Sequence, residues 1–443
     1  MRRRTIELAV VLVAAMGVEA REASLRAREA IYCAPVRAGN STERFLRSVE
    51  MTRVGLRAGE DGALKGRRYT DGPSRLRVNE MSSPVQDAST SLGKPEWHDQ
   101  TLPLAGDVVE VIYGADQAEF VVRDFKFRDG ESLAELRLHY ATLGKPVRDA
   151  AGRVTNAVML LHGTGGSGAQ FLQPQFAGEL FGAGQLLDTA KYYIIFPDGI
   201  GHGKSSKPSD GLHAKFPQYD YDDMVAAHHA LLEHLGVEHL RLILGTSMGC
   251  MHSFVWGETY PEFMDALMPL ACQPVQIAGR NRVWRRMVMD AIRNDPEWKG
   301  GEYTTEPRQG LRTALDLLLI AGSAPLLMQK NYPTRDAADK YLDEYFAARM
   351  PGLDANDLLY AVNASRNYDP SPGLEKIRAR VMYVNSADDF INPPELGIAE
   401  REIRRVAGAK FVVIPISDAT HGHGTHTWAA VWKAYLAELL AVK

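Results

Sequence analysis

Short, uninterrupted apolar runs recur from residue 157 onward, and stretches with helical periodicity separate them. Runs of this kind are typical of strands buried on both faces of a parallel sheet. They predict strands at 157–161, 192–196, 240–244, 266–270, 381–384 and 411–414. Between them, one face of an amphipathic helix is formed by Met224, His228, Leu231, Leu232 and Leu235.

A hairpin is expected upstream of these strands. Two strand-like runs at 118–127 and 133–142 flank Arg128-Asp129-Gly130, which is a typical turn sequence. A further strand is expected at 108–113. An antiparallel hairpin followed by alternating strands and helices predicts an α/β fold, with a mostly parallel sheet and right-handed crossovers.

The alternation stops between 275 and 365, where the pattern is helical and rich in Arg, Met and aromatic residues. We interpret 275–365 as an inserted helical cap, because strands resume afterwards and complete the same sheet. The core is then 106–274 together with 366–443. A second, independent domain is the alternative interpretation.

The first 105 residues differ from the rest of the chain in composition and in the periodicity of their apolar residues. Residues 1–20 resemble a signal peptide, since Arg2, Arg3 and Arg4 precede an apolar run at 8–18 that is too short for a membrane span. We expect 21–105 to be a disordered or poorly ordered leader, because it is arginine-rich and lacks apolar periodicity. A signal peptide predicts an exported or periplasmic protein. A start further downstream, with Met81 as one option, would predict a cytoplasmic one.

Composition narrows the possible partners. The chain has 443 residues, 45% of them hydrophobic, which is enough for a large core. A net charge of −4 does not favour nucleic-acid binding. Three scattered cysteines cannot form a multi-bridge scaffold, and no Cys-x-x-Cys pair is present. No later apolar run is long enough for a stable membrane span.

The most informative motif is Gly245-Thr246-Ser247-Met248-Gly249. It lies between the strand at 240–244 and a helix expected at 248–260, so Ser247 would stand at a sharp strand-to-helix turn. Such a turn exposes the serine oxygen at the positive end of a helix. The motif predicts a nucleophilic serine, and the alternative is a serine in a tight structural turn.

A glycine-rich loop, His162-Gly163-Thr164-Gly165-Gly166, follows the strand at 157–161. A loop in this place can aim a backbone N–H at a developing oxyanion, and we expect Thr164 and Met248 to supply the two donors. A phosphate-binding loop is the competing interpretation. The lysine and Ser/Thr that such a loop needs after its last glycine are missing here.

A carboxylate and a histidine are expected after the last two strands. Asp388 and Asp389 follow the strand at 381–384, and we choose Asp389 as the residue that orients the general base. That base is one of His421, His423 and His426, which follow the strand at 411–414.

The same histidines suggest a rival interpretation, because His-x-His-x-x-His can ligate zinc. Thr425 stands where the corresponding metallo-β-lactamase motif has aspartate, and only seventeen residues follow His426. We therefore predict no metal and no cofactor.

Together these residues resemble the α/β-hydrolase-fold homoserine O-acetyltransferases and their relatives, over about 119–440. The resemblance includes these sequences: Phe216-Pro217, Met248-Gly249-Cys250-Met251, Asp295-Pro296-Glu297-Trp298-Lys299-Gly300-Gly301, Asp354-Ala355-Asn356, Tyr368-Asp369 and Pro393-Pro394. It implies an α/β-hydrolase fold with Ser247 as nucleophile, Asp389 as acid and His423 as base, and the Gly422-His423 step selects the histidine. It also implies a homodimer.

The chain departs from this family at places that bear on the substrate. The loop at 198–204 lacks the family's Asn-x-Leu-Gly-x-Cys-x-Gly sequence. Asn363 stands where the family has an arginine that contacts the amino-acid substrate, with Arg366 three residues on. These two residues and Arg280 are the substrate-binding candidates, since cap arginines can bind a carboxylate or a coenzyme A phosphate. A solvated helix face is the alternative for the arginines.

The sequence therefore predicts a serine-nucleophile acyl-transfer enzyme that hydrolyses a small acyl ester through an acyl-enzyme. One alternative is an O-acetyltransferase that moves an acetyl group from acetyl-CoA to a hydroxyl acceptor such as homoserine. An alternative of another class is a catalytically dead binding protein on a hydrolase scaffold.

Overall fold

The computed structural model describes residues 114–441. The expected signal peptide at 1–20, the leader at 21–105 and the strand at 108–113 lie outside the described residues.

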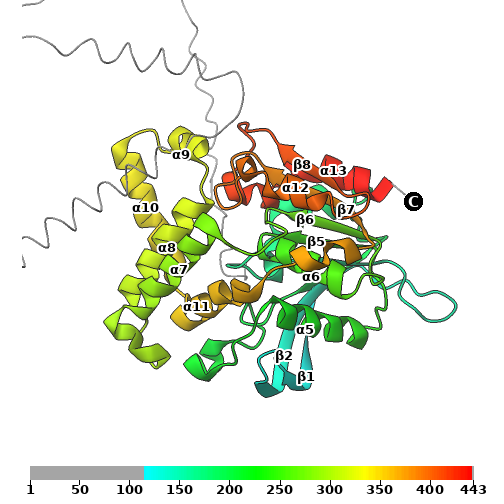
Figure 1. Cartoon of the computed structure of the whole chain (residues 1–443), viewed down its shortest axis with the longest axis horizontal. Coiled ribbons are helices and arrows are strands. Elements are labelled where there is room, and N and C mark those ends of the chain that lie inside the picture. The colour runs from blue at the N-terminus through cyan, green and yellow to red at the C-terminus, as the bar shows by residue number, and fades with distance from the viewer. Residues whose placement is uncertain (1–113, 442–443) are drawn as a thin grey trace, which may run out of the picture. The chain divides into compact units, whose positions relative to one another are not determined.

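An eight-stranded sheet forms the centre of the described chain (Figure 1). Its strands are β1 (Asp116–Lys126), β2 (Ser132–Leu143), β3 (Ala157–Leu161), β4 (Tyr193–Pro197), β5 (Leu242–Thr246), β6 (Ala266–Leu270), β7 (Arg380–Ser386) and β8 (Lys410–Ile414). They lie in the order β1-β2-β4-β3-β5-β6-β7-β8. β2 pairs antiparallel with both β1 and β4, and the other neighbours are parallel. This confirms the predicted fold class.

In the described part of the chain, ten α-helices form the connections between strands and the cap, and short 3₁₀ segments link them. The α-helices are α4 (Pro174–Leu180), α5 (Tyr221–His234), α6 (Met248–Thr259), α7 (Gly279–Arg293), α8 (Arg308–Gly322), α9 (Pro325–Asn331), α10 (Arg335–Arg349), α11 (Ala355–Asn363), α12 (Ile398–Ile403) and α13 (Ala429–Ala441). The 3₁₀ segments are η1 (Gly168–Leu172), η2 (Pro208–Asp210), η3 (His213–Lys215), η4 (Pro296–Gly301), η5 (Ala364–Asn367), η6 (Ser371–Lys376), η7 (Pro394–Leu396) and η8 (Gly422–Thr427).

Alternation along the buried strands divides the core between the two faces of the sheet. On β5, Ile243 belongs to the cluster that contains residues of α5 and α6. Its neighbours Leu242 and Leu244 belong to a second cluster with residues of α4 and α13. Successive side chains of a strand point to opposite faces, so each strand contributes to both layers.

The helices α7 to α11 all lie between β6 and β7 in the sequence (Figure 1). Buried side chains of α7 and α11 join the same cluster as those of α5 and α6. A smaller cluster of α8 and α10 residues contains Leu315, Leu319, Tyr341, Tyr345 and Phe346. The inserted helices are therefore packed on the sheet domain through α7 and α11 and on each other through α8 and α10.

In the described chain no single helix is long and apolar enough to cross a bilayer. Only α8 and α9 taken together, bent by 104°, reach that length and composition.

A disulfide joins Cys250, in the first turn of α6, to Cys272, just after β6. The sequence analysis did not predict this pair, because cysteine spacing does not reveal which residues of α6 and the β6 loop lie side by side. The bridge fixes the start of α6 to the edge of the sheet from which the cap departs.

We expect that loss of this disulfide destabilises the fold. Cross-linking residues 22 positions apart removes loop entropy from the unfolded chain worth about 3 kcal/mol. Replacing both Cys250 and Cys272 by alanine should lower the urea midpoint, while Cys33→Ser should not. With this bridge, the denatured protein should have one thiol that can be alkylated before reduction, that of Cys33, and three after reduction. Three thiols before reduction would contradict the bridge.

Candidate active site

Ser247 lies at a strained turn between β5 and α6. Its backbone has φ 53° and ψ −105°, a positive φ that a residue with a side chain rarely adopts. β5 ends at Thr246 and α6 begins at Met248, so the strand runs two residues further than the sequence predicted. A strain of this kind costs about 1–3 kcal/mol and persists where the surrounding structure enforces it.

Two glycines make this turn possible. A Cβ on Gly245 would lie 1.9 Å from the carbonyl oxygen of Gly249, and a Cβ on Gly249 would lie 2.0 Å from that of Leu161. Real Cβ atoms do not approach backbone this closely, so side chains at these two positions would crowd the turn. The absence of these two side chains lets α6 pack directly against the end of β3.

The side chains of Ser247, His423 and Asp389 form a hydrogen-bonded chain. His423 Nε2 is 2.8 Å from Ser247 Oγ, and Nδ1 is 3.1 Å from both carboxylate oxygens of Asp389. With Nδ1–H donating to the carboxylate, Nε2 is left to accept the hydroxyl proton. This is the arrangement in which an imidazole can take a proton from serine while a carboxylate orients it.

Asp389 is buried and held in its ionised form. Burial by itself favours the neutral carboxyl, but His423 and hydrogen bonds from Asn392 outweigh it and lower the pKa of Asp389. Its Oδ1 accepts the N–H groups of Ile391 at 2.8 Å and Asn392 at 3.0 Å. Asp388 instead accepts the N–H of Gly422 at 3.1 Å, which ties the loop of β7 to the loop that carries His423.

The other two histidines of the cluster lie elsewhere. The His421 ring stacks on Trp428, with centroids 4.0 Å apart. His426 meets His423 edge to face at 5.1 Å, and burial, with the nearby His423, lowers the pKa of His426 to about 3. Within residues 114–441, no group of three or more His, Cys, Asp or Glu side chains is arranged to hold a metal ion.

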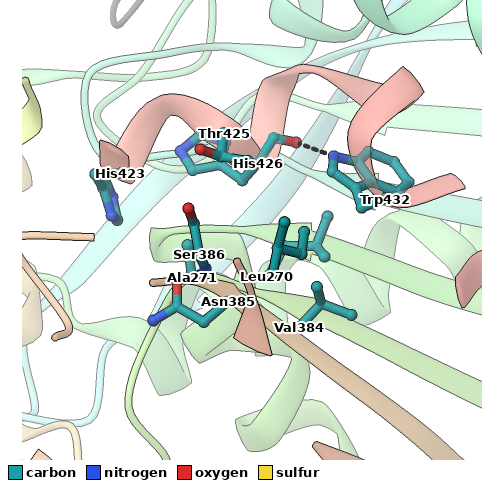
Figure 2. Close-up of a pocket in the computed structure, with 10 residues that line it drawn as sticks. Leu270, Ala271, Val384, Asn385, Ser386, His423, Thr425, His426 and Trp432 are labelled. Atoms are coloured by element: carbon teal, nitrogen blue, oxygen red, sulfur yellow. Dashed lines mark hydrogen bonds between the residues drawn. The ribbon is translucent and has the colours of Figure 1, made fainter. Parts of the chain in front are cut away.

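Figure 2 shows a small cavity beside His423. Ser386 and Asn385 from β7, Thr425, and His426 line it, and the indole of Trp432 donates a 3.1 Å hydrogen bond to the His426 carbonyl. The buried Nδ1 of His426 has no hydrogen-bond partner. With about 10 Å³ of internal space, the cavity has the size of a single water site.

The glycine-rich loop after β3 lies directly against the nucleophile. A Cβ built on Gly163 would be 3.4 Å from Ser247 Cβ. The His162 carbonyl accepts the N–H of Gly249 at 2.9 Å, which joins the loop to the start of α6. For the N–H groups of Thr164 and Met248, no protein acceptor is found in the described part of the chain. Both candidate donors are therefore available to a bound group.

His202 supports this loop from the segment at 198–204, where the chain departs from the family. Its Nε2 is 2.9 Å from the Thr164 carbonyl, and its Nδ1 is 2.9 Å from the Ile200 carbonyl. Burial, with His162 nearby, lowers the pKa of His202 to about 4. The sequence analysis did not single out His202, although its position in the divergent loop was a signal that could have been followed.

The three substrate-binding candidates all lie near the base of the cap, and each has contacts of its own. Arg280 covers the Phe390 ring at 3.6 Å and donates to the Phe390 carbonyl. Asn363 donates to Gln218 Oε1 at 3.1 Å. Arg366 donates two hydrogen bonds of 2.6 Å to the carbonyls of Tyr219 and Gln218. The bonds of Asn363 and Arg366 hold the end of the cap to Gln218 and Tyr219, which lie just before α5.

Comparisons with known proteins fit this geometry. A family profile described as alpha/beta hydrolase fold matches residues 156–416. The chain is similar to the homoserine O-acetyltransferase of Moorella thermoacetica, at 30% identity over 359 residues, or 70% of this chain and 92% of the relative. It is also 30% identical over 282 residues to a probable acyltransferase of Methanothermobacter thermautotrophicus, covering 62% of this chain and 84% of the relative.

Solved structures show the same fold. The homoserine O-acetyltransferase from Bacillus anthracis matches with a TM-score of 0.66 at 19% identity, over 74% of this chain and 98% of that one. An acetylester hydrolase from Corynebacterium glutamicum matches with a TM-score of 0.65 at 20% identity, over 77% and 99%. The acetyl esterase MekB matches with 0.64 at 23% identity, over 75% and 98%.

Fold and site together define an enzyme of the α/β-hydrolase class. Within that class, the chain belongs to the homoserine O-acetyltransferase-like family.

Buried histidines behind the oxyanion loop predict sensitivity to acid. Burial, with His162 nearby, lowers the pKa of His228 to about 3, and that of His202 is lowered to about 4. Below the ordinary value of about 6.5 the unfolded chain binds protons that the native chain does not. Native stability should therefore be complete above that value and fall as the pH drops toward 4.

Each such histidine should contribute a slope of up to about 1.4 kcal/mol per pH unit. Within residues 114–441 neither ring nitrogen of His228 makes a hydrogen bond of good geometry, and the Asp198 backbone interacts with the ring only weakly enough that burial still lowers the pKa. His228→Leu should therefore fold and should flatten the loss of stability. Urea midpoints measured between pH 7 and pH 4.5 test this. An unchanged slope in His228→Leu would show that His228 is not one of the groups responsible.

Proposed function

We propose that the protein is a serine-dependent acyl-transfer enzyme whose nucleophile is Ser247. The hydroxyl oxygen attacks the carbonyl carbon of an acyl ester while His423 Nε2 takes the proton, and Asp389 stabilises the imidazolium. The tetrahedral oxyanion is bound by the N–H groups of Thr164 and Met248. As it collapses, the C–O bond to the alcohol breaks and His423 returns the proton to the leaving oxygen.

The second half of the reaction regenerates the serine. A water molecule or another hydroxyl compound gives its proton to His423 and attacks the acyl carbon, and Ser247 leaves with that proton. The observation that carries this proposal is the continuous chain of contacts at 2.8 and 3.1 Å from the serine oxygen through His423 to Asp389. It begins at a serine whose backbone is held at a positive φ.

We further propose that the acceptor is water and that the physiological reaction is hydrolysis of a small acyl ester. The loop at 198–204 supports this, because it departs from the family sequence while packing against the oxyanion loop through His202. Acetyl-ester hydrolases are also among the solved structures with this fold.

The second candidate is acetyl transfer from acetyl-CoA to a hydroxyl acceptor such as homoserine. It is favoured by the similarity to a homoserine O-acetyltransferase that extends over 92% of that relative.

The nucleophile and base are tested by covalent labelling. Wild-type protein should react with a fluorophosphonate probe, and Ser247→Ala should abolish both labelling and turnover, with a loss of roughly 10⁴–10⁶-fold. Among the histidines, His423→Ala should be as damaging as Ser247→Ala, and His421→Ala should retain most activity. Loss confined to His421→Ala would refute the assignment of the base. An unlabelled wild type would favour the dead scaffold.

The acyl acceptor is tested by a product assay with p-nitrophenyl acetate and acetyl-CoA, each with and without L-homoserine. We expect Ser247-dependent ester cleavage, and free coenzyme A release that homoserine does not accelerate. Homoserine-dependent formation of O-acetylhomoserine would instead identify the protein as a transferase, because water must then be a poorer acceptor than the amino acid.

A further inference from the structure

Arg285 of α7 is a buried arginine at the junction of cap and sheet domain, with only 2% of its surface exposed. Its Nε donates to Asn281 Oδ1 at 2.9 Å, and its Nη1 donates to Ser365 Oγ at 3.2 Å. Both acceptors are neutral. The guanidinium thus has hydrogen-bond partners but no opposite charge.

No carboxylate compensates this charge within residues 114–441. Arg285 takes part in none of the ion pairs there. Burial lowers the pKa of its guanidinium, an interaction with the Tyr221 hydroxyl opposes this, and the nearby cation Arg282 lowers the pKa as well. A guanidinium stays protonated at all ordinary pH values. A buried charge is normally paired or bound to something, because leaving it unpaired is costly. The guanidinium is therefore an enclosed positive charge that no carboxylate among residues 114–441 neutralises.

Two further buried donors lie near this charge. Within residues 114–441 the indole Nε1 of Trp284 has no hydrogen-bond partner. The hydroxyl of Tyr221 makes no hydrogen bond of good geometry there, although Ser365, Arg285 and Thr164 lie close enough to interact with it. The Trp284 ring lies 4.7 Å from the Arg285 guanidinium carbon. Arg285 is also the strongest electrostatic neighbour of the Tyr221 hydroxyl, although burial outweighs it and raises the pKa of that group. Buried donors without acceptors around an unpaired cation are the complement of an anion.

This cluster adjoins the proposed reaction centre on two sides. The Tyr221 hydroxyl also interacts with the side chain of Thr164 in the oxyanion loop. On the other side, Asn281 Nδ2 donates to Asn392 Oδ1 at 3.2 Å, and Asn392 Nδ2 lies 3.3 Å from Asp389 Oδ2. Two side-chain amides therefore connect Arg285 to the carboxylate that orients His423.

We propose that Arg285, with Tyr221, binds a carboxylate carried by the substrate. The inference rests on the proposed acyl-transfer function and specifies its substrate class. One planar guanidinium beside one neutral hydroxyl matches a single negative charge in a planar group, which a carboxylate provides. That carboxylate belongs either to the acyl part, as in a half-ester of a dicarboxylic acid, or to the alcohol part, as in an ester of a hydroxy acid.

Matched ester pairs distinguish these two sources. Monoethyl glutarate and ethyl pentanoate differ only in a carboxylate on the acyl chain. The ions of 4-acetoxybutanoate and butyl acetate differ in the same way on the alcohol. Rates are followed with a pH-stat. We expect wild-type enzyme to prefer the charged member of one pair, and the pair that shows the preference locates the carboxylate.

In Arg285→Met the ratio of kcat/KM for the charged to the neutral ester of that pair should fall roughly 10- to 10²-fold. Arg285→Lys should fall between, because it keeps the charge but loses the planar fork. The matched control is Arg286→Gln on the same helix. Arg286 is exposed and already paired with Asp290 at 2.7 Å, so the ratio should not change.

Equal losses on both members of a pair, or no charge preference in either pair, would overturn the proposal. A thermal midpoint that falls in Arg285→Met while the ratio stays constant would mark a purely structural arginine and overturn it too, since removing an uncompensated buried charge should not destabilise the free enzyme. If Arg285→Met fails to fold, inhibition of the wild-type enzyme tests the proposal instead. Glutarate should compete with butyl acetate and pentanamide should not, and equal inhibition by both would overturn the proposal.

Failure of the subsite is distinguishable from failure of the proposed function. Fluorophosphonate labelling of Ser247 without any charge preference would remove only the carboxylate site. In an unlabelled protein, a glutarate-induced rise in thermal midpoint that is absent in Arg285→Lys would support the anion site although the catalytic proposal had failed. No such rise would overturn both.

Discussion

Ser247 sits at φ 53°, and its neighbours Gly245 and Gly249 have no room for a side chain. The tightness of this turn follows from how closely β5, α6 and the end of β3 approach one another. The same approach sets Gly163 against the Ser247 side chain. Among the described residues, the N–H groups of Thr164 and Met248 have no protein acceptor. Neighbouring elements add restraints, since Cys250 is bridged to Cys272 and the His162 carbonyl binds Gly249. The serine is thus exposed by backbone geometry that the sheet enforces.

Two buried charged groups near this turn, Asp389 and Arg285, differ in whether an opposite charge lies beside them. Asp389 is fully buried, yet His423 and two backbone N–H groups satisfy it, so its charge is stable. Arg285, at the other end of the Asn281 and Asn392 pair, has only neutral partners. A fold gains nothing in stability from an unpaired buried cation, which is why we connect Arg285 with a ligand.

The chain shares its fold with homoserine O-acetyltransferases and with acetyl-ester hydrolases alike. The similarity covers most of the chain length of a named acetyltransferase, while acetyl-ester hydrolases share the fold equally well. The loop at 198–204 is one place where the chain differs from the family in sequence. Its sequence is unlike the family's, but His202 and Asp198 still bind the oxyanion loop and η1, through the Thr164 carbonyl and the Gly168 N–H. These two contacts fix the loop against the segments that follow β3.

The sequence by itself determined the sheet, its hairpin and the elbow, because an apolar run, a turn sequence and a glycine-flanked serine are local patterns with local causes. It missed two residues at the end of β5, since the elbow's backbone extends the strand up to Ser247. Only the tertiary structure decided features that depend on long-range contact. His421, His423 and His426 are equivalent in sequence, and orientation alone sets one of them between Ser247 and Asp389 while another stacks on Trp428. The pairing of Cys250 with Cys272 and the burial of Arg285 beside neutral partners are decided in the same way, because packing between distant segments determines which side chains meet.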